Sequence, residues 1–225
     1  MSTSRLLSLA LVAALGCPAT AYAREDSQLW TGAAVNVKLG GKWRLNQEVV
    51  VRFSDNRNGL YEIESNTLLG YAVTPTLTLA AGYTHDPQYA GGHFTVLERR
   101  AREQVTVDKL LTIGRGSVTG RLRAEQRWRD GLDGTGWRLR PFARYSLPIA
   151  GKAKLVLSNE TFVNLNTTVF QRQSGFERMR NFAGISVPVS KKISVEAGYL
   201  NQYFFIRNGE DQSDHVASLS LSGNF

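Results

Sequence analysis

The chain has 225 residues, of which 42% are hydrophobic and 10% aromatic, with 21 glycines and a formal net charge of +8 at pH 7. No segment beyond the first two dozen residues approaches the ~18 unbroken apolar residues of a membrane helix, which excludes a helical membrane protein. Cys17 is the single cysteine, so the rest of the chain has no disulfide or cysteine nucleophile. Many aromatic residues and glycines favour an all-β chain with many turns.

The first 23 residues have the pattern of a secretory signal. Arg5 precedes the uncharged run LLSLALVAALG at residues 6–16, and the small residues of AYA at 21–23 match the positions that a signal peptidase reads. We therefore predict a cleaved signal peptide at residues 1–23 and a single domain at residues 24–225.

The stretch KWRLNQEVVVRF, from Lys42 to Phe53, alternates between apolar and charged residues. Period-two alternation over this length predicts a strand longer than the usual ~5–6 residues of a soluble sheet. Trp43 and Phe53 lie at the two ends of its apolar face. At ~3.3 Å per residue and a tilt near 45° they are separated by roughly 23 Å, the height of an outer-membrane apolar band.

The same alternation recurs along the chain and predicts an antiparallel transmembrane β-barrel with short periplasmic turns and longer external loops. The loops include HDPQYAGGH at residues 85–93 and DGLDGTG at residues 130–136. Bacterial barrels generally have an even number of strands. We therefore expect ten to twelve strands, with the first segment either paired with a further strand or lying in or against a ten-stranded barrel. The candidate strands are residues 28–38, 42–53, 61–73, 77–84, 94–108, 117–129, 137–146, 153–163, 177–187, 192–206 and 214–225.

The last predicted strand, within HVASLSLSGNF, ends on an aromatic residue. Leu219, Leu221 and Phe225 share one face of this strand. A terminal phenylalanine that closes an alternating strand resembles the signal by which bacterial barrel-assembly machinery recognises its clients. We predict that these three residues form an assembly signal.

The chain resembles the bacterial outer-membrane barrel proteins known as domain of unknown function 2490. The resemblance extends over nearly all of the predicted domain, although ERRAREQ at residues 98–104 is richer in charge than the family pattern. It implies a fold and an outer-membrane location and supplies no activity. The residues that carry it are Trp30, Trp43, Arg52, Glu98, Arg100, Glu160, Phe162, Asn164, Arg180, Gly184 and GYLNQ at 198–202.

Inward-facing arginines are concentrated on the predicted strands 117–129 and 137–146. One strand contributes Arg121, Arg123, Glu125, Arg127 and Arg129, and the next contributes Arg138, Arg140 and Arg144. Folded as a hairpin, these strands set arginine roughly opposite arginine, which costs stability unless carboxylates or bound anions intervene. The other predicted pore-lining residues are Glu48, Glu62, Glu64, Glu98, Arg100, Glu160, Arg180 and Glu196.

Two interpretations of this lumen remain open. Arginine and glutamate either interlock and fill a narrow barrel, or the arginines line a passage and draw anions through it. We predict a narrow channel that favours small anionic solutes. The alternative is a structural barrel without transport that contacts lipopolysaccharide, for which Arg57, Arg172 and Arg207 in the predicted outer loops are candidates. Lipid and barrel-assembly machinery are the other expected partners.

A lipid-modifying enzyme is a weaker alternative. His85, His93 and His215 are the only histidines, and no spacing predicts a nucleophile hydrogen-bonded to an oriented base. We predict no enzymatic activity and no cofactor. We also predict no metal site, because ordinary polar loop residues account for His85, Asp86 and His93. Nucleic acid is not an expected partner, since the basic residues are spread through strands with no recognisable binding fold.

Overall fold

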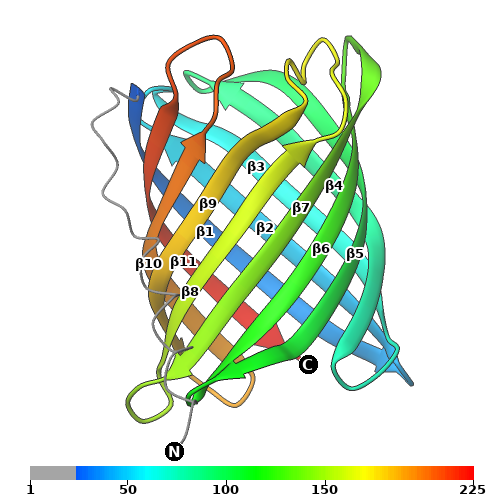
Figure 1. The fold of residues 1–225 in the computed structure, drawn as a ribbon, viewed down its shortest axis with the longest axis vertical. Coiled ribbons are helices and arrows are strands. Elements are labelled where there is room, and N and C mark those ends of the chain that lie inside the picture. The colour runs from blue at the N-terminus through cyan, green and yellow to red at the C-terminus, as the bar shows by residue number, and fades with distance from the viewer. Residues whose placement is uncertain (1–23) are drawn as a thin grey trace, which may run out of the picture.

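A computed structural model describes residues 24–225, which form one closed β-barrel (Figure 1). The predicted signal peptide lies outside the described residues. Residues 24–225 include no helix that is long and apolar enough to cross a membrane. The strands are β1 (Arg24–Gly40), β2 (Trp43–Ser54), β3 (Gly59–Ala72), β4 (Leu77–Ala90), β5 (His93–Ile113), β6 (Gly116–Arg129), β7 (Leu132–Pro148), β8 (Lys154–Asn164), β9 (Gly175–Pro188), β10 (Ile193–Phe204) and β11 (Gln212–Asn224).

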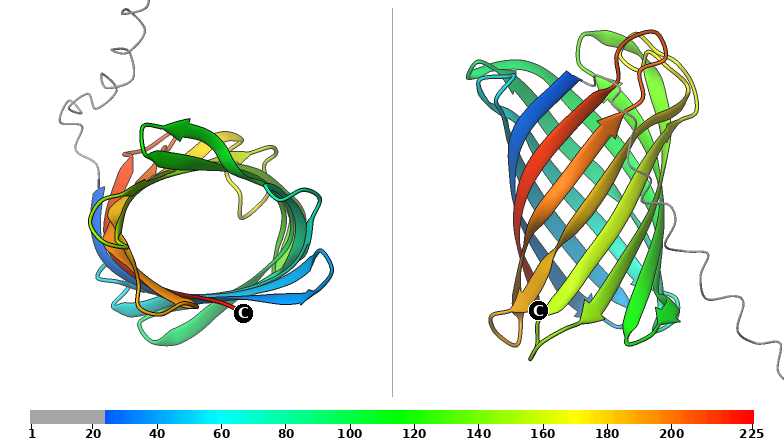
Figure 2. Two further views of the ribbon diagram at one scale, coloured as in Figure 1. Left: turned by 90° about the horizontal axis from the view of Figure 1, so that it is seen from below. Right: turned by 60° about the vertical axis from the view of Figure 1, so that its left-hand side comes forward.

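Each strand pairs with its sequence neighbours in antiparallel fashion, and the ring closes between β1 and β11. This last pair is parallel, with its register running from Arg24 opposite Gln212 to Asn36 opposite Asn224. Figure 2 shows the closed ring from below. The prediction of a purely antiparallel barrel is therefore wrong, because an odd number of alternating strands leaves the first and last strands running the same way. The first segment is a full barrel strand that needs no further partner.

The two ends of the barrel differ in their connections, but less than predicted. Turns at the end that carries residue 225 are short, as expected, whereas only residues 165–174 and 205–211 form long connections at the other end. The predicted loop at residues 85–93 is mostly strand, because β4 and β5 continue to a two-residue turn. Gly91 and Gly92 both have positive φ in this turn, which glycine adopts without strain. Asp86 and Gln88 of this segment lie at inward strand positions, which accounts for part of its polarity.

The outer wall and the lumen have opposite compositions. On β2, the side chains of Trp43 and Phe53 are exposed on the outer wall, whereas Arg52 is buried in the lumen. Large apolar residues are exposed on other strands as well, among them Leu69, Leu122, Leu157, Ile185 and Leu221. The core therefore lies inside the barrel, and most of the side chains buried there are polar or charged. The buried hydrophobic residues are Trp30, Tyr61, Leu68, Val156, Phe162 and Val216.

Candidate functional site: the charged lumen

Glu98 on β5 is the centre of one group of ion pairs. Its carboxylate accepts hydrogen bonds from Arg127 Nε at 2.8 Å and Arg129 Nε at 2.6 Å, both from the neighbouring strand β6. It also accepts a bond of 2.6 Å from Arg100 Nε on its own strand. Arg100 in turn pairs with Asp86 on β4. The carboxylate that pairs with the β6 arginines at this level thus comes from β5, outside the arginine hairpin.

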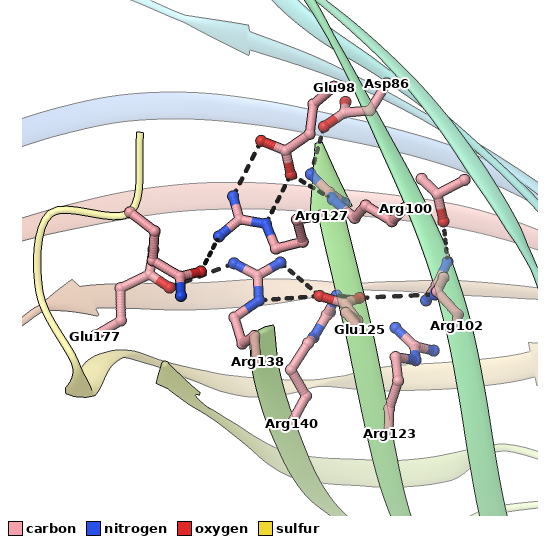
Figure 3. A network of polar contacts seen from close by, with 12 residues as sticks. Asp86, Glu98, Arg100, Arg102, Arg123, Glu125, Arg127, Arg138, Arg140 and Glu177 are labelled. Atoms are coloured by element: carbon pink, nitrogen blue, oxygen red, sulfur yellow. Dashed lines mark hydrogen bonds and ion pairs between the residues drawn. The ribbon is translucent and has the colours of Figure 1, made fainter. Parts of the chain in front are cut away.

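Glu125 on β6 is the centre of a second group, drawn in Figure 3. It accepts hydrogen bonds of 2.6 Å from Arg138 Nη2 and from Arg140 Nη1, both on β7. Arg140 also donates to Glu160 on β8, with 2.8 Å between Nη2 and Oε2. All four side chains are buried, and Glu125 has no exposed surface, so each of these bonds forms away from bulk water. Such buried charge-assisted bonds are strong as pairs and costly to break singly.

The expectation that arginine opposes arginine along this hairpin holds at one position only. Arg123 lies directly opposite Arg140, whereas Glu125 lies opposite Arg138. Arg121 lies opposite Phe142 and pairs with Glu160. The single glutamate of the hairpin, Glu98 of β5 and Glu160 of β8 therefore pair with five of its seven arginines.

The remaining predicted residues also face the lumen. Arg52 Nη2 lies 3.0 Å from Glu64 Oε2 and Arg52 pairs with Glu62 as well. Glu48 accepts a bond of 3.0 Å from the Asn66 side chain. On the far wall, Arg144 Nη1 and Glu196 Oε1 are 3.0 Å apart. The structure thus brings the predicted lumen residues together on inward strand positions, and their role in lining a pore stays a prediction.

Aromatic rings inside the lumen contact several of the arginines. The ring of Phe162, 1% exposed, has the guanidinium carbons of Arg140 and Arg180 at 4.3 and 4.7 Å from its centroid. Arg180 also lies 4.6 Å from the centroid of Trp30. These distances suit cation–π attraction. We call Trp30, Glu64, Arg140, Phe162 and Arg180 the septum, because they lie where two cavities of the lumen meet: Phe162 lines one, Trp30 the other, and the remaining three line both.

One cavity lies on each side of the septum. The loop-end chamber, about 360 Å³, lies beneath the loop of residues 165–174. The turn-end chamber, about 500 Å³, lies toward the short turns. Glu64, Arg140 and Arg180 line both chambers, so the two cavities meet at the septum.

The loop of residues 165–174 is part of the lumen wall, a position that its sequence does not predict. Gln171 is 3% exposed, and its Oε1 accepts a bond of 2.9 Å from Arg127 Nη1. Its Nε2 donates to the carbonyl oxygen of Trp137 at 3.1 Å. The loop is thereby fastened over one end of the barrel.

Several charged lumen residues were also missed. Arg102 shares its parity with Glu98 and Arg100, so alternation alone could have identified it. Asp86 was assigned to a loop, and its strand position follows only from the length of β4. Glu177 lies inward beside Arg178, because the register of β8 and β9 shifts between Phe162 and Val163. No periodic signal predicts such a bulge.

The histidines form no shared site. His215 lies on β11 and its Nδ1 is 2.6 Å from the hydroxyl of Tyr199 on β10. In the described part of the chain, no group of three or more His, Cys, Asp or Glu side chains is placed to hold a metal ion. The absence of enzymatic activity stays a prediction.

The fold and the site define a closed β-barrel with an apolar outer wall and a lumen of paired charges. Residues 27–214 match a family described as a protein of unknown function, DUF2490, and the chain belongs to this family, as the resemblance predicted. An uncharacterized protein of Methylorubrum extorquens AM1 is 31% identical over 219 residues, which cover 96% of this chain and 95% of that protein. No solved structure matches the chain.

Proposed function

We propose that the protein is an outer-membrane β-barrel that forms a narrow channel favouring small anions. The outer wall supports the membrane location, since large apolar side chains such as Leu122 and Leu157 are exposed around the ring. A contiguous apolar surface of this kind suits lipid better than water. The predicted signal peptide gives the chain a route to that membrane.

The arrangement of the two chambers carries the channel proposal. They lie end to end inside one closed barrel and share Arg140, Arg180 and Glu64 where they meet. Arginines outnumber carboxylates in the wall of the turn-end chamber. A charged cleft with low-dielectric walls concentrates the field and raises the local concentration of the opposite ion. The charged residues of this wall are Glu48, Arg52, Glu64, Arg121, Arg123, Arg140, Arg144, Glu160, Arg180 and Glu196.

A structural barrel without transport is the second candidate, and the septum favours it. Four guanidinium groups contact the ring of Phe162, from Arg138, Arg140, Arg178 and Arg180. A septum that stays closed would fill the lumen as side chains fill narrow barrels. In that case Arg57 and Arg172, which line the loop-end chamber, would serve contact with lipopolysaccharide at the rim.

Conductance of the purified protein in a planar bilayer tests the channel proposal. A steady current whose reversal potential under a KCl gradient lies toward that of chloride is the expected result. A protein that inserts fully and passes no current supports the structural barrel instead. Insertion is checked independently by the shift in gel mobility between heated and unheated samples.

A further inference from the structure

The turn-end chamber has two chemically different walls. Arginines of β6 and β7 form one wall, namely Arg121, Arg123, Arg140 and Arg144. The other wall, from β9, β10, β11 and β1, carries Arg180 and Glu196, and apart from them mostly serine hydroxyls beside Gly32 and Ala34. Because the serines, Gly32 and Ala34 are small, the second wall leaves the chamber open. The serines are Ser186, Ser194, Ser218, Ser220 and Ser222.

Arg123 is the arginine of this wall whose charge the protein leaves uncompensated. It is 5% exposed, and within residues 24–225 no carboxylate oxygen lies within 4.0 Å of its guanidinium nitrogens. Its Nε and Nη2 both donate to one neutral acceptor, Gln104 Oε1, at 3.0 and 2.9 Å. Figure 3 shows Arg123 beside the ion-pair network with no contact to the carboxylates drawn there. A buried cation without a partner costs free energy, which an anion bound beside it would offset.

Two neighbouring arginines also have unused donors. The Nε atoms of Arg121 and Arg140 are buried and, among the described residues, have no hydrogen-bond partner. Arg140 lies directly opposite Arg123 in the hairpin. Guanidinium groups bind carboxylate and phosphate through paired, geometrically matched hydrogen bonds. The arginine wall is thus short of acceptors where Arg123 reaches the chamber.

The serine wall indicates the chemistry of the part of the ligand that lies away from Arg123. Serine hydroxyls donate and accept hydrogen bonds, as the hydroxyls of a polyol do. Ser220 lies opposite Gly32 on β1, and Ser222 lies opposite Ser194 on β10, so the hydroxyls follow neighbouring strands. The volume of about 500 Å³ falls within the roughly 300–1,000 Å³ of sites for small organic molecules. It is far larger than a simple ion needs.

We propose that the turn-end chamber binds a small polyhydroxylated anion, a sugar acid or a sugar phosphate. The acid group binds at Arg123 and the hydroxyls bind along the serines. This site deepens the proposed function and rests on it for access, since the ligand enters through the same lumen. Carboxylate and phosphate share the chemistry that Arg123 recognises, and the experiment separates them.

Isothermal titration calorimetry of the purified chain in detergent at low salt tests the site. The titrants are glucuronate, glucose 6-phosphate, glucose and inorganic phosphate. We expect glucuronate or glucose 6-phosphate to bind at least tenfold more tightly than both glucose and inorganic phosphate, and the tighter of the two identifies the acid group. Equal affinity for inorganic phosphate overturns the role of the serines, and equal affinity for glucose overturns the role of Arg123.

Variants assign the binding to the two walls. Arg123→Gln should weaken binding of the preferred sugar anion at least tenfold, whereas the matched control Arg99→Gln, on the outer wall, should leave it unchanged. Ser220→Val should weaken the sugar anion severalfold without changing the affinity for inorganic phosphate. If Arg123→Gln fails to insert, the affinities of Ser220→Val for the sugar anion and for inorganic phosphate test the proposal on their own. Unchanged binding in both lumen variants contradicts the proposal.

The outcome for the site is separable from the outcome for the channel. An anion-selective current with no sugar-anion binding retains the channel and overturns the site. Binding that Arg123→Gln abolishes, in a protein that passes no current, retains the site and overturns the channel.

Discussion

Arg123 and Arg140 lie directly opposite each other on β6 and β7, yet only Arg140 is paired with carboxylates. Arg140 contacts Glu125 and Glu160, while Arg123 bonds only to the neutral Gln104. The hairpin therefore combines two uses of arginine. Most of its arginines hold the lumen together, and one is available to an anion.

The first prediction concerns the structural arginines. Glu125→Gln removes a buried carboxylate bonded to Arg138 and Arg140, each of which then keeps a single carboxylate partner, Glu177 and Glu160 respectively. We expect it to lower the free energy of unfolding by about 3–5 kcal/mol, as for breaking one side of a buried ion pair. Urea titration of the protein refolded in lipid vesicles measures the loss.

Asp130→Asn is the control for this substitution. Asp130 pairs with Arg99 where both side chains are nearly half exposed, so its loss should cost only about 0–1 kcal/mol. Similar costs for the two variants would show that the buried network does not stabilise the barrel.

The second prediction tests which face of β2 meets lipid. Val49→Arg places a charge on the outer wall and should cost about 2–4 kcal/mol near the bilayer midplane. Val50 lines the turn-end chamber and lies opposite Glu64 on β3, so Val50→Arg should cost much less. Refolding into vesicles across a urea series compares the two. Equal penalties would contradict a lipid-facing outer wall.

Alternation in the sequence predicted much of the fold. The strand from Lys42 to Phe53 keeps the two faces expected of it, since Trp43 is exposed and Arg52 is buried. The parallel closure between β1 and β11 was not predicted, because it depends on the total number of strands. Residues 85–90 were assigned to a loop because polarity alone does not distinguish a loop from a strand whose inner face is polar.

Alternation in the sequence predicts which residues of the site face the lumen. It does not predict which of these residues pair with one another. Parity places Arg123 and Glu125 on the inner face of β6, but it does not say which arginine lacks a carboxylate. That depends on the register of β6 against β5, which sets Arg123 beside Gln104. The bulge at Glu177 likewise follows from contacts between strands.

The third prediction concerns the septum. Phe162→Ala removes a ring contacted by four arginines and should widen the junction between the chambers. We expect single-channel conductance to rise severalfold, at a stability cost of about 3–5 kcal/mol for a buried aromatic side chain. Leu157→Ala, on the outer wall of the same strand, is the control and should leave conductance unchanged. An unaltered conductance in Phe162→Ala would mean that ions do not pass the septum.

The fourth prediction concerns assembly. The backbone of Phe225 bonds to β1, accepting from Lys38 N at 2.9 Å and donating to Asn36 O at 2.8 Å. Its exposed ring lies 4.9 Å from Lys192 Nζ. Deleting Phe225, or changing it to Asp, should reduce the fraction of protein in the outer membrane, whereas Phe225→Tyr should not. Normal insertion of the Asp variant would contradict an assembly signal at Leu219, Leu221 and Phe225.

The most direct test of anion preference is the reversal potential under a KCl gradient at low salt, where screening of the lumen charges is weak. Replacing Arg123, Arg127, Arg140 and Arg144 together by Gln removes four lumen charges, but Arg127 and Arg140 are bound to Glu98 and Glu125. Arg123→Gln alone removes the charge that no carboxylate compensates. We predict that the wild type prefers chloride over potassium and that Arg123→Gln loses much of this preference while inserting normally. A wild type without current, or a variant equally selective for chloride, would contradict it.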